Sequence, residues 1–374
     1  MRKGKRQTAV AALTWGADAL LWLSAGSAYV PPARLPLLAA AGLAFPFCLA
    51  AVLFMLAVTL AVARRHAWVP LLGLLLAGGT LRAYCPVNLS APEAEDGIVV
   101  MTYNTEAFAH NRYDADGNNA VAAYIARQKA DIVCLQEATP CPIDLYDKET
   151  APLLGRTYAH TDTVHIAANV LACLSRWPVA EHGLICSNGN NGAAYFKVVP
   201  PDGDTVIVVN CHLESMHLSH EERREYHDIV THKRPGADGQ SAAGDTLRDN
   251  SLEDSSRRLL GKVSAAAVAR AAQADAVAGF VRANARRPLI LCGDFNDTPV
   301  SYTRRRIARA GLTDAYEARG TGIGRSFYRD AIYVRIDHIF CSAHYRPLSC
   351  HTDPGFTVAD HCPVFAVLAR RPAP

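Results

Sequence analysis

The stretch Pro288-Leu289-Ile290-Leu291-Cys292-Gly293-Asp294-Phe295-Asn296-Asp297 joins a short apolar run to a cluster of carboxylates and a carboxamide. Its apolar part, Pro288–Cys292, has the length and composition of a buried β-strand, and the glycine after it marks a turn. A second acidic motif, Val358-Ala359-Asp360-His361-Cys362-Pro363-Val364, opens another apolar run, Cys362–Leu368. Both stretches predict strands with polar side chains at the edge of a β-sheet.

Strand and helix patterns alternate on both sides of these motifs. The predicted strands are Gly97–Tyr103, Asp131–Leu135, Val164–Cys173, Ala193–Val199, Thr205–Val209, Pro288–Cys292, Arg335–Cys341 and Cys362–Leu368. The predicted helices are Asn118–Lys129 and Ser251–Ala285. This order indicates a layered α/β domain whose polar site lies at strand ends, and we expect the last two strands to form a closing pair.

The N-terminal part of the chain has the composition of a membrane segment. Thr8–Val30 is apolar apart from Asp18, and Leu35–Ala63 carries no charge. Each run exceeds the ~20 residues that a helix needs to cross the hydrocarbon core. A third run, Trp68–Leu81, is short for a span, although Ala67–Val87 would reach across if its one arginine extends to the interface.

Three regions follow from this composition. Residues 1–87 are predicted to be a membrane anchor with two or three transmembrane helices, residues 88–96 a polar linker, and residues 97–374 the catalytic domain. A cleavable signal peptide is the alternative for the start, but the second long apolar run directly behind it argues against cleavage.

The basic residues predict the orientation of the anchor. Four of them lie within Met1–Arg6, and Arg64-Arg65 lies in the second connection, whereas the first connection holds only Arg34. The positive-inside rule then keeps the N-terminus and the second connection in the cytoplasm. Three crossings place the catalytic domain outside the cytoplasm and two leave it inside; we favour three, in an integral protein of a bacterial inner membrane.

The net charge of +3 hides an asymmetry. Residues 1–92 hold eight Lys or Arg and one acid, which leaves 30 basic and 34 acidic side chains in the remainder. A mildly acidic domain is not the footprint of a strong, sequence-independent duplex binder, although a local basic rim would suffice for a nuclease.

The polar motifs hold the groups that hydrolysis of a phosphoester requires. Charge builds on the phosphoryl and leaving-group oxygens, and a hard cation such as Mg²⁺ or Mn²⁺ bound by oxygen ligands neutralises it. A histidine beside a carboxylate, as in Asp360-His361, has a suitable pKa to act on the attacking water. Candidate oxygen ligands at strand ends are Asn104, Glu106, Glu137, Asp294, Asn296 and Asp360.

Six motifs together resemble the endonuclease/exonuclease/phosphatase superfamily, and they occur in its order over about residues 96–370. They are Met101-Thr102-Tyr103-Asn104-Thr105-Glu106, Leu135-Gln136-Glu137, Asn210-Cys211-His212-Leu213-Glu214-Ser215, Gly293-Asp294-Phe295-Asn296, Arg335-Ile336-Asp337-His338 and Ala359-Asp360-His361. Two residues depart from the family pattern: Ala359 replaces a usual Ser, and His338 stands where Tyr is more common. Neither departure removes a catalytic group.

The resemblance implies a four-layer α/β sandwich, two packed sheets flanked by helices, with a divalent-metal site. It implies the metal ligands Asn104, Glu106, Glu137 and Asp360, and the catalytic residues His212, Asp294, Asn296, Asp337 and His361. Asn296 and His212 would also bind the phosphate, and Arg176 is a further candidate contact.

In this scheme Glu137 is the principal metal ligand, and Asp294 orients or deprotonates the attacking water. His361 acts as general base or charge stabiliser, with Asp337 aligning it, and His212 stabilises the transition state. The implied function is hydrolysis of a phosphoester by a nuclease-like phosphodiesterase acting on nucleic acid, and the alternative is a sphingomyelinase-like hydrolase of a phospholipid head group or a small-molecule phosphoesterase. The bilayer is the partner of the anchor, and no protein partner is inferred.

Each motif, taken alone, also has a non-catalytic explanation. An Asp-His pair is commonly a surface feature, Glu137 suits a helix N-terminus, and Gly293–Asn296 suits an ordinary turn. Six such coincidences in family order are improbable, so the enzyme interpretation is preferred. A catalytically silent membrane binding module is the remaining alternative, and the intact set of candidate ligands argues against it.

Two other features are weighed as sites. The histidines His217, His220, His227 and His232 have spacings that do not line one helix face, which disfavours zinc. The basic run Arg304–Arg306 is expected to be a solvated surface rather than a phosphate grip.

Overall fold

The computed structural model describes residues 2–89, 96–113, 119–139, 154–155, 157–201, 203–216, 243–329 and 334–371. The four candidate zinc histidines, most of the expected linker at 88–96 and the C-terminal residues 372–374 lie outside the described residues.

Two six-stranded sheets form the body of the protein. The first has the order β11 (Tyr345–Thr352), β12 (Val364–Arg370), β1 (Ile98–Asn104), β2 (Ile132–Gln136), β4 (Asn169–Ser175) and β3 (His160–Ile166). The second has the order β5 (Val179–Asn188), β6 (Asn191–Val198), β7 (Val206–His212), β8 (Leu289–Asp294), β10 (Asp337–Cys341) and β9 (Thr313–Asp314).

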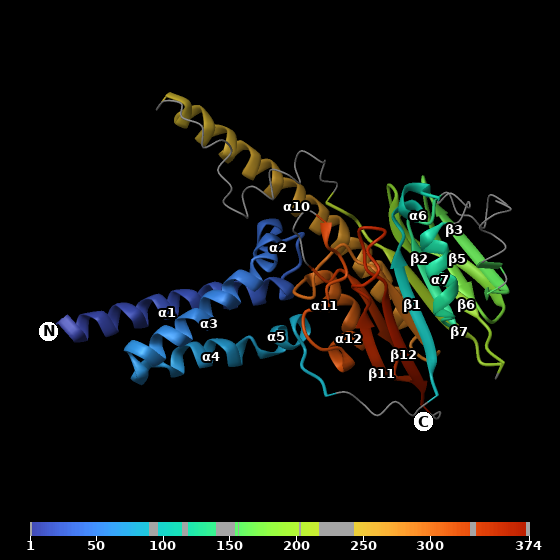
Figure 1. The fold of residues 1–374 in the computed structure, drawn as a ribbon, viewed down its shortest axis with the longest axis horizontal. Helices are drawn as coiled ribbons and strands as arrows, with labels where there is room; N and C mark the ends of the chain where they lie inside the picture. Colours follow the sequence, from blue (N-terminus) through green and yellow to red (C-terminus); the bar gives the residue numbers. More distant parts are fainter. Residues whose placement is uncertain are drawn as a thin grey trace.

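The sheets pack face to face and helices cover their outer faces (Figure 1). Apolar side chains of the two inner faces form one core, including Val100, Ile132, Val208 and Ile290. Helix α7 (Ala120–Gln128) packs on the outer face of the first sheet. The C-terminal part of α10 (Ala243–Ala283) and α11 (Tyr302–Ala308) pack on the outer face of the second. The expected four-layer α/β sandwich is therefore confirmed.

Strand register brings the polar motifs to one edge. The parallel strands β1 and β2 pair Asn104 with Gln136 at their carboxyl ends. The parallel strands β7 and β8 end at the pair His212 and Asp294. The antiparallel strand β10 begins beside the same position, since Asp337 pairs with Asp294. Carboxyl ends of parallel strands share an edge, so both sheets deliver their polar ends to one place.

The N-terminal helices project away from the sheets (Figure 1). They are α1 (Arg2–Gly26), α2 (Pro36–Leu43), α3 (Phe45–Val62), α4 (Trp68–Leu76) and α5 (Gly78–Tyr84). Gly4–Tyr29 and Phe45–Val62 are each long and apolar enough to cross a membrane. The pair Arg64–Leu76 and Gly78–Tyr84, bent by 61°, gives a third candidate if it counts as one span.

The near end of these helices is fixed to the α/β body. The buried side chain of Arg335 donates to the carbonyl oxygens of Ala83 and Ile323, and its guanidinium lies 4.0 Å from the centre of the Tyr316 ring. Gly42 of α2 approaches Val300 so closely that an added Cβ would lie 2.7 Å from its carbonyl oxygen. A larger residue at 42 would therefore separate α2 from the body.

The basic run Arg304–Arg306 is a packing feature, not the solvated surface expected. Arg304 is buried and donates to Asp314, with its Nη2 at 2.7 Å from Oδ2. Arg305 lies over the ring of Tyr29, 3.5 Å from its centre, and Arg306 pairs with Asp275. Because two of the three side chains bind other parts of the body and one binds the N-terminal helices, the run joins the chain's two parts.

Three elements predicted from the sequence differ in detail from those in the structure. The single strand expected at Val164–Cys173 is a hairpin, β3 and β4, turning at Ala167, which has a φ of 50°. The expected closing pair is split, because β10 lies in the second sheet and β12 in the first. The apolar run Leu35–Ala63 is broken into α2 and α3 near Pro46, whose ring removes a backbone donor at the start of α3.

Candidate active site

Three of the predicted site residues, each just after a strand, have a left-handed backbone conformation. Glu106, Glu137 and Asn296 have φ values of 47°, 49° and 51° and come just after β1, β2 and β8. Residues other than glycine rarely adopt this conformation, and where they do the site is commonly functional. Gly293 supports the arrangement, since at its φ of 135° a Cβ would lie 2.0 Å from the Cys211 carbonyl oxygen.

A carboxamide joins the two sheets at the centre of the site. Nδ2 of Asn104 lies 3.0 Å from Oε1 of Glu137 and 3.1 Å from Oδ2 of Asp294. The Glu137 side chain is 39% exposed and that of Asp294 only 1%. One carboxylate therefore faces the solvent while the other is enclosed beside it.

Burial sets the charge balance of Asp294. Desolvation raises the pKa of this carboxyl to about 6, although His361 and His212 nearby oppose the shift. Its second oxygen, Oδ1, accepts from the backbone N–H of Asn296 at 2.7 Å. Asp294 is thus held rigidly and has a pKa suited to exchanging a proton near neutrality.

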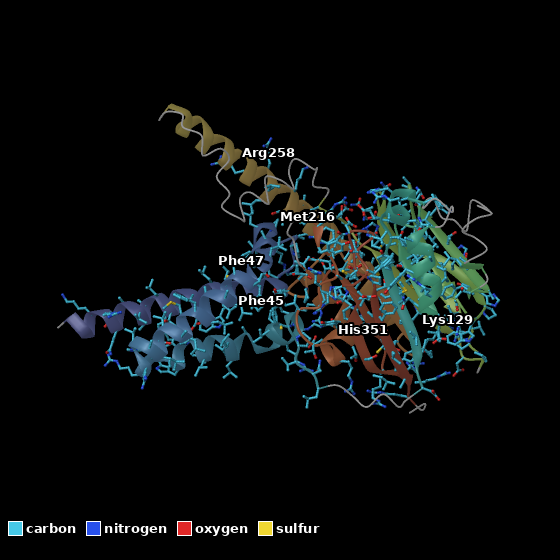
Figure 2. All side chains as sticks on the ribbon, in the orientation of Figure 1. Phe45, Phe47, Lys129, Met216, Arg258 and His351 are labelled. Carbon is cyan, nitrogen blue, oxygen red and sulfur yellow. The ribbon has the colours of Figure 1, made fainter. Side chains whose placement is uncertain are left out.

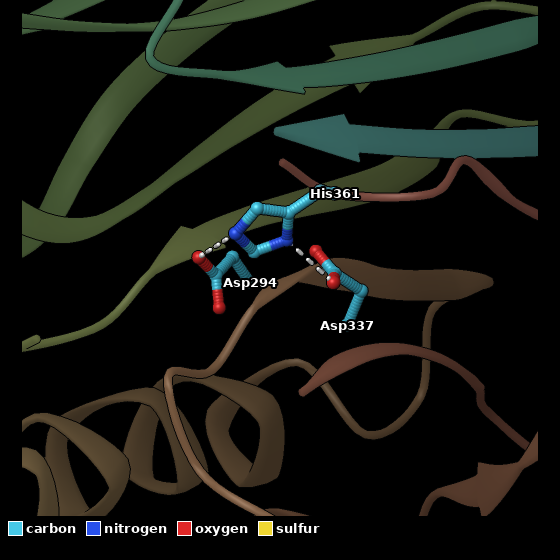
Figure 3. A group of neighbouring side chains, drawn as sticks. All are labelled: Asp294, Asp337 and His361. Carbon is cyan, nitrogen blue, oxygen red and sulfur yellow. Dashed lines mark hydrogen bonds and ion pairs between the residues drawn. The ribbon is translucent and has the colours of Figure 1, made fainter. Parts of the chain in front are cut away.

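His361 lies between two buried aspartates (Figure 3). Its Nδ1 donates to Oδ2 of Asp337 at 2.8 Å, and its Nε2 lies 3.7 Å from Oδ2 of Asp294. Burial alone would lower the pKa of His361, but the two carboxylates outweigh it and hold the pKa well above its usual range. The two carboxylates therefore favour the protonated, cationic form of the ring.

His212 is fixed by a residue that the sequence did not single out. Nδ2 of Asn169 lies 2.8 Å from Nδ1 of His212. An amide nitrogen only donates, so Nδ1 accepts and the ring proton of neutral His212 sits on Nε2. That nitrogen lies 3.5 Å from Oε1 of Glu137 and 3.7 Å from Oδ2 of Asp294. The donor therefore points to the centre of the site.

Glu106 and Asp360 share a cationic partner, Arg329, which the sequence analysis also missed. Arg329 donates to Glu106 and lies 3.2 Å from Oδ2 of Asp360. The backbone N–H of Asp360 donates to Oε2 of Glu106 at 3.1 Å. These two predicted ligands are thus drawn together around one positive charge.

The site opens into a cavity of about 790 Å³. The predicted residues that line it are Asn104, Glu137, His212, Asp294, Asn296, Asp360 and His361. Asp337 lies behind His361, and Glu106 reaches the site through Asp360. Nine of the ten predicted residues are therefore at or directly behind one cavity.

Arg176 is the exception. It follows the far end of β4 and donates to Oδ1 of Asp131, which precedes β2, at 2.9 Å. Since Asn104 and Glu137 follow the opposite ends of β1 and β2, Arg176 cannot contact a phosphate at this site, and its assignment was wrong. An arginine directly after an apolar strand gives no sequence signal of which sheet edge it occupies.

The donor set fits a hard divalent cation. Five carboxylates, those of Glu106, Glu137, Asp294, Asp337 and Asp360, gather here beside two imidazoles, the Asn104 amide and the Arg329 guanidinium, and Mg²⁺ prefers such oxygen ligands. Asp294, Asp337 and His361 place ligand atoms within 4.8 Å of one another. Because His361 already uses Nδ1 for Asp337, we interpret that trio as a catalytic relay and the more exposed carboxylates as the cation-binding side.

Two family models match separate parts of the chain. A family model described as "Endonuclease/Exonuclease/phosphatase family" matches residues 101–361. A second model, a domain of unknown function (DUF8431), matches residues 7–84. A search of curated proteins gives no match.

Several solved structures are similar in fold at low sequence identity. An endonuclease/exonuclease/phosphatase from Beutenbergia cavernae is 18% identical with a TM-score of 0.48, covering 74% of this chain and 72% of its own. The catalytic domain of human Nocturnin, with bound sulfate, is 16% identical with a TM-score of 0.46, covering 76% and 97%. A mannosyl-6-phosphatase from Bacteroides thetaiotaomicron is 17% identical with a TM-score of 0.41, covering 73% and 99%.

Proposed function

The chain belongs to the endonuclease/exonuclease/phosphatase family, and from this we propose that it is a membrane-anchored hydrolase that cleaves phosphoester bonds with the help of Mg²⁺ or Mn²⁺. The observation that carries the proposal is the meeting of Glu137, Asp294 and His361 around one cavity. These groups come from both sheets and are far apart in sequence.

Asp294 is suited to act on the attacking water. Its Oδ2 lies near Nδ2 of Asn104 and near the Nε2 atoms of His212 and His361, so it is oriented from three sides. Ionised Asp294 accepts the proton of the water as the oxygen attacks phosphorus in line with the leaving group.

His361 and His212 are suited to hold the phosphoryl group. The cationic ring of His361, aligned by Asp337, stabilises negative charge as it develops on the phosphoryl oxygens. His212 donates from Nε2, and the side-chain amide of Asn296, fixed by the Leu213 carbonyl oxygen at 2.9 Å, lies at the same cavity. Neither role requires these groups to move.

The proposed cation ligands are Glu137, as the principal one, with Asn104, Glu106 and Asp360 around it. When bound, a divalent cation supplies charge neutralisation at the departing oxygen. Arg329 offsets one of the two negative charges of Glu106 and Asp360 in the described structure, so a bound cation would share these carboxylates with the guanidinium.

A catalytically silent membrane module remains the alternative from another class. Such a module would be expected to lack at least one of Glu137, Asp294 and His361. All three are present: Asn104 contacts Glu137 and Asp294, His212 contacts Glu137, and His361 contacts Asp294. For an active enzyme the candidate substrates are a nucleic acid, a phospholipid and a small phosphoester.

The N-terminal helices support a three-span anchor at residues 1–87. Helix α4 packs along α1, since the Trp15 and Trp68 rings are 5.8 Å apart and Trp22 donates to the Gly73 carbonyl oxygen. Helix α5 then reaches the body near the carboxyl end of α1, where Tyr29 contacts Arg305. The chain thus leaves the anchor opposite the basic N-terminus, which favours an extracytoplasmic domain at residues 97–374 behind the 88–96 linker.

The function is tested with the purified full-length protein and bis(4-nitrophenyl) phosphate, in Mg²⁺, in Mn²⁺ and in EDTA. We expect turnover only with the cation, and its loss in Glu137→Ala and His361→Ala with the fold retained by circular dichroism. Wild-type rates in both variants would refute the mechanism.

A reporter that is active only in the cytoplasm, fused at Pro374, tests the topology and should stay inactive.

A further inference from the structure

The active-site cavity has an apolar wall that the catalytic groups do not explain. One side comes from the start of the third N-terminal helix and the residues before it, Leu43, Phe45 and Phe47. The other comes from α10, with Leu259, Leu260 and Val263. Figure 2 shows Phe45 and Phe47 at the end of the N-terminal helices that faces the α/β body.

Part of this wall is open to solvent. Phe47 is 60% exposed and Leu260 44%, whereas Phe45 in the same wall is buried. Large apolar side chains left open at a cavity that also holds Asp294 and His361 indicate an occupant with a polar end and an apolar end.

The wall is continuous with the segment proposed to enter the membrane. Phe45 begins Phe45–Val62, which is apolar and long enough to span, and Tyr29 ends the other candidate span, Gly4–Tyr29. Both ends lie against the body, through Val300 packed with Phe45 and through Arg305 over Tyr29. The cavity therefore lies where the spans meet the body, within reach of lipid from the same bilayer.

The charge of the wall does not suit a polyanion. Among the described residues that line the cavity, Arg270 is the one lysine or arginine. It is buried and engaged, with Nε at 3.2 Å from Oδ2 of Asp297 and Nη1 donating to the Glu214 carbonyl oxygen at 2.9 Å. A nucleic-acid strand requires free cations along its backbone, and the described part of this lining supplies no lysine or arginine for that purpose beyond the engaged Arg270.

We propose that the substrate is a lipid phosphoester taken from the bilayer, whose head lies at Asp294 and His361 and whose hydrocarbon chain lies between Phe47 and Leu260. This inference rests on the proposed function and adds the substrate class to it. The apolar wall made by the N-terminal helices is then part of the specificity pocket, and the anchor serves recognition as well as attachment.

The test compares two esters with the same leaving group, methyl 4-nitrophenyl phosphate and dodecyl 4-nitrophenyl phosphate. The full-length protein is assayed in lipid nanodiscs with Mg²⁺, and the readout is the ratio of kcat/KM for the dodecyl ester to that for the methyl ester. We expect a ratio of about 100 or more, since each buried methylene contributes roughly fourfold. Thymidine 5′-(4-nitrophenyl phosphate) serves as the nucleotide comparator.

Variants separate the cavity wall from simple partition of the long ester into the bilayer. Phe47→Ser with Leu260→Ser should lower the ratio at least about tenfold, since both contacts to the chain are lost. Leu184→Ser is the matched control, because Leu184 is an exposed apolar residue on β5 away from the cavity, and it should keep the wild-type ratio.

The outcomes distinguish the lipid assignment from the proposed hydrolase function on which it rests. Equal efficiency for the two alkyl esters, a ratio unchanged in the double variant, or preference for the nucleotide ester would overturn the lipid assignment while leaving the hydrolase in place. Failure to hydrolyse any of the three esters would remove the proposed hydrolase, and the lipid assignment with it.

Discussion

The Nε2 atom of His361 lies 3.7 Å from Oδ2 of Asp294, and the opposite nitrogen of the same ring donates to Asp337 at 2.8 Å. A histidine enclosed by two buried carboxylates keeps its positive charge, because each carboxylate stabilises the cation that burial alone would disfavour. The water therefore loses its proton to Asp294 in our account, and His361 stabilises charge on the phosphoryl group.

Asp337→Asn should lower kcat by about 10²–10⁴-fold with little change in KM, because the neutral amide no longer aligns His361 or favours its charge. The expected signature is a fall in the pKa of His361, measured by NMR with labelled histidine. Asp162→Asn is the matched control, since Asp162 holds His182 at 2.6 Å outside the cavity. A kcat equally reduced in both variants would show that the effect is structural.

Glu137→Gln should raise the Mg²⁺ concentration needed for half-maximal activity by at least about tenfold, because a principal ligand loses its charge. The readout is a Mg²⁺ titration of activity together with calorimetric binding of Mn²⁺. Glu181→Gln, an exposed carboxylate on β5 paired with Lys197, is the control and should titrate like the wild type. An unchanged Mn²⁺ affinity in Glu137→Gln would place the cation elsewhere.

Arg335→Leu should destabilise the junction between the N-terminal helices and the body. The buried carbonyl oxygen of Ala83 and the partly buried one of Ile323 would lose their donor, at a cost of about 2–4 kcal/mol. For a protein of this size that corresponds to a fall in Tm of roughly 3–5 °C. Differential scanning calorimetry in detergent measures it, with Arg127→Leu on the exposed side of α7 as control. Equal Tm values would mean that Arg335 does not hold the junction.

Acid should destabilise the body through His338. Burial lowers the pKa of this ring to about 4, so between pH 6.5 and 4 the unfolded chain binds a proton that the folded chain does not. The contribution of His338 to the free energy of unfolding should therefore fall as the pH drops through that window, by at most about 3 kcal/mol, while Asp294, whose pKa is raised to about 6, acts in the opposite direction. His338→Phe, beside Phe295 and Phe340, should flatten this part of the curve.

Asp314 should cause a second loss of stability at lower pH. Burial would raise the pKa of this carboxyl, but Arg304, His338 and Arg335 outweigh burial and hold the pKa at about 2. Its contribution is present above its ordinary pKa of 3.8 and is lost as the pH falls from there towards 2. Urea unfolding at a series of pH values, for the wild type and His338→Phe, separates the two losses of stability. The same pH dependence from 6.5 to 4 in the wild type and in His338→Phe would contradict the His338 assignment, and a wild-type curve that is flat from pH 3.8 to 2 would contradict the Asp314 assignment.

The sequence predicted the strands that carry the site because each is a fully buried apolar run that ends in a polar residue. Pro288–Cys292 and Thr205–Val209 correspond to β8 and β7, and their motifs were placed at the correct edge. Strand β5 was missed because it is half-exposed and its polar residues conceal the alternation.

Other parts of the site depended on contacts that local patterns do not show. The turn at Ala167 and Ala168 lacks the glycine or asparagine that marks hairpins, so the hairpin and the role of Asn169 were missed. Arg329 follows no strand, and the packing of Phe45 and Phe47 beside the cavity is set by tertiary contacts of the N-terminal helices. The length and apolar composition of the N-terminal runs predicted these helices but not the surface on which they pack.

The most direct test of the central claim is hydrolysis of bis(4-nitrophenyl) phosphate in water enriched in ¹⁸O, followed by mass spectrometry of both products. Attack of water on phosphorus at one cation-dependent centre predicts a single ¹⁸O atom in the 4-nitrophenyl phosphate and none in the 4-nitrophenol. The label should appear with Mg²⁺ and be lost in EDTA and in Asp294→Asn. Undiminished labelling in EDTA or in Asp294→Asn, or ¹⁸O in the phenol, would contradict the account.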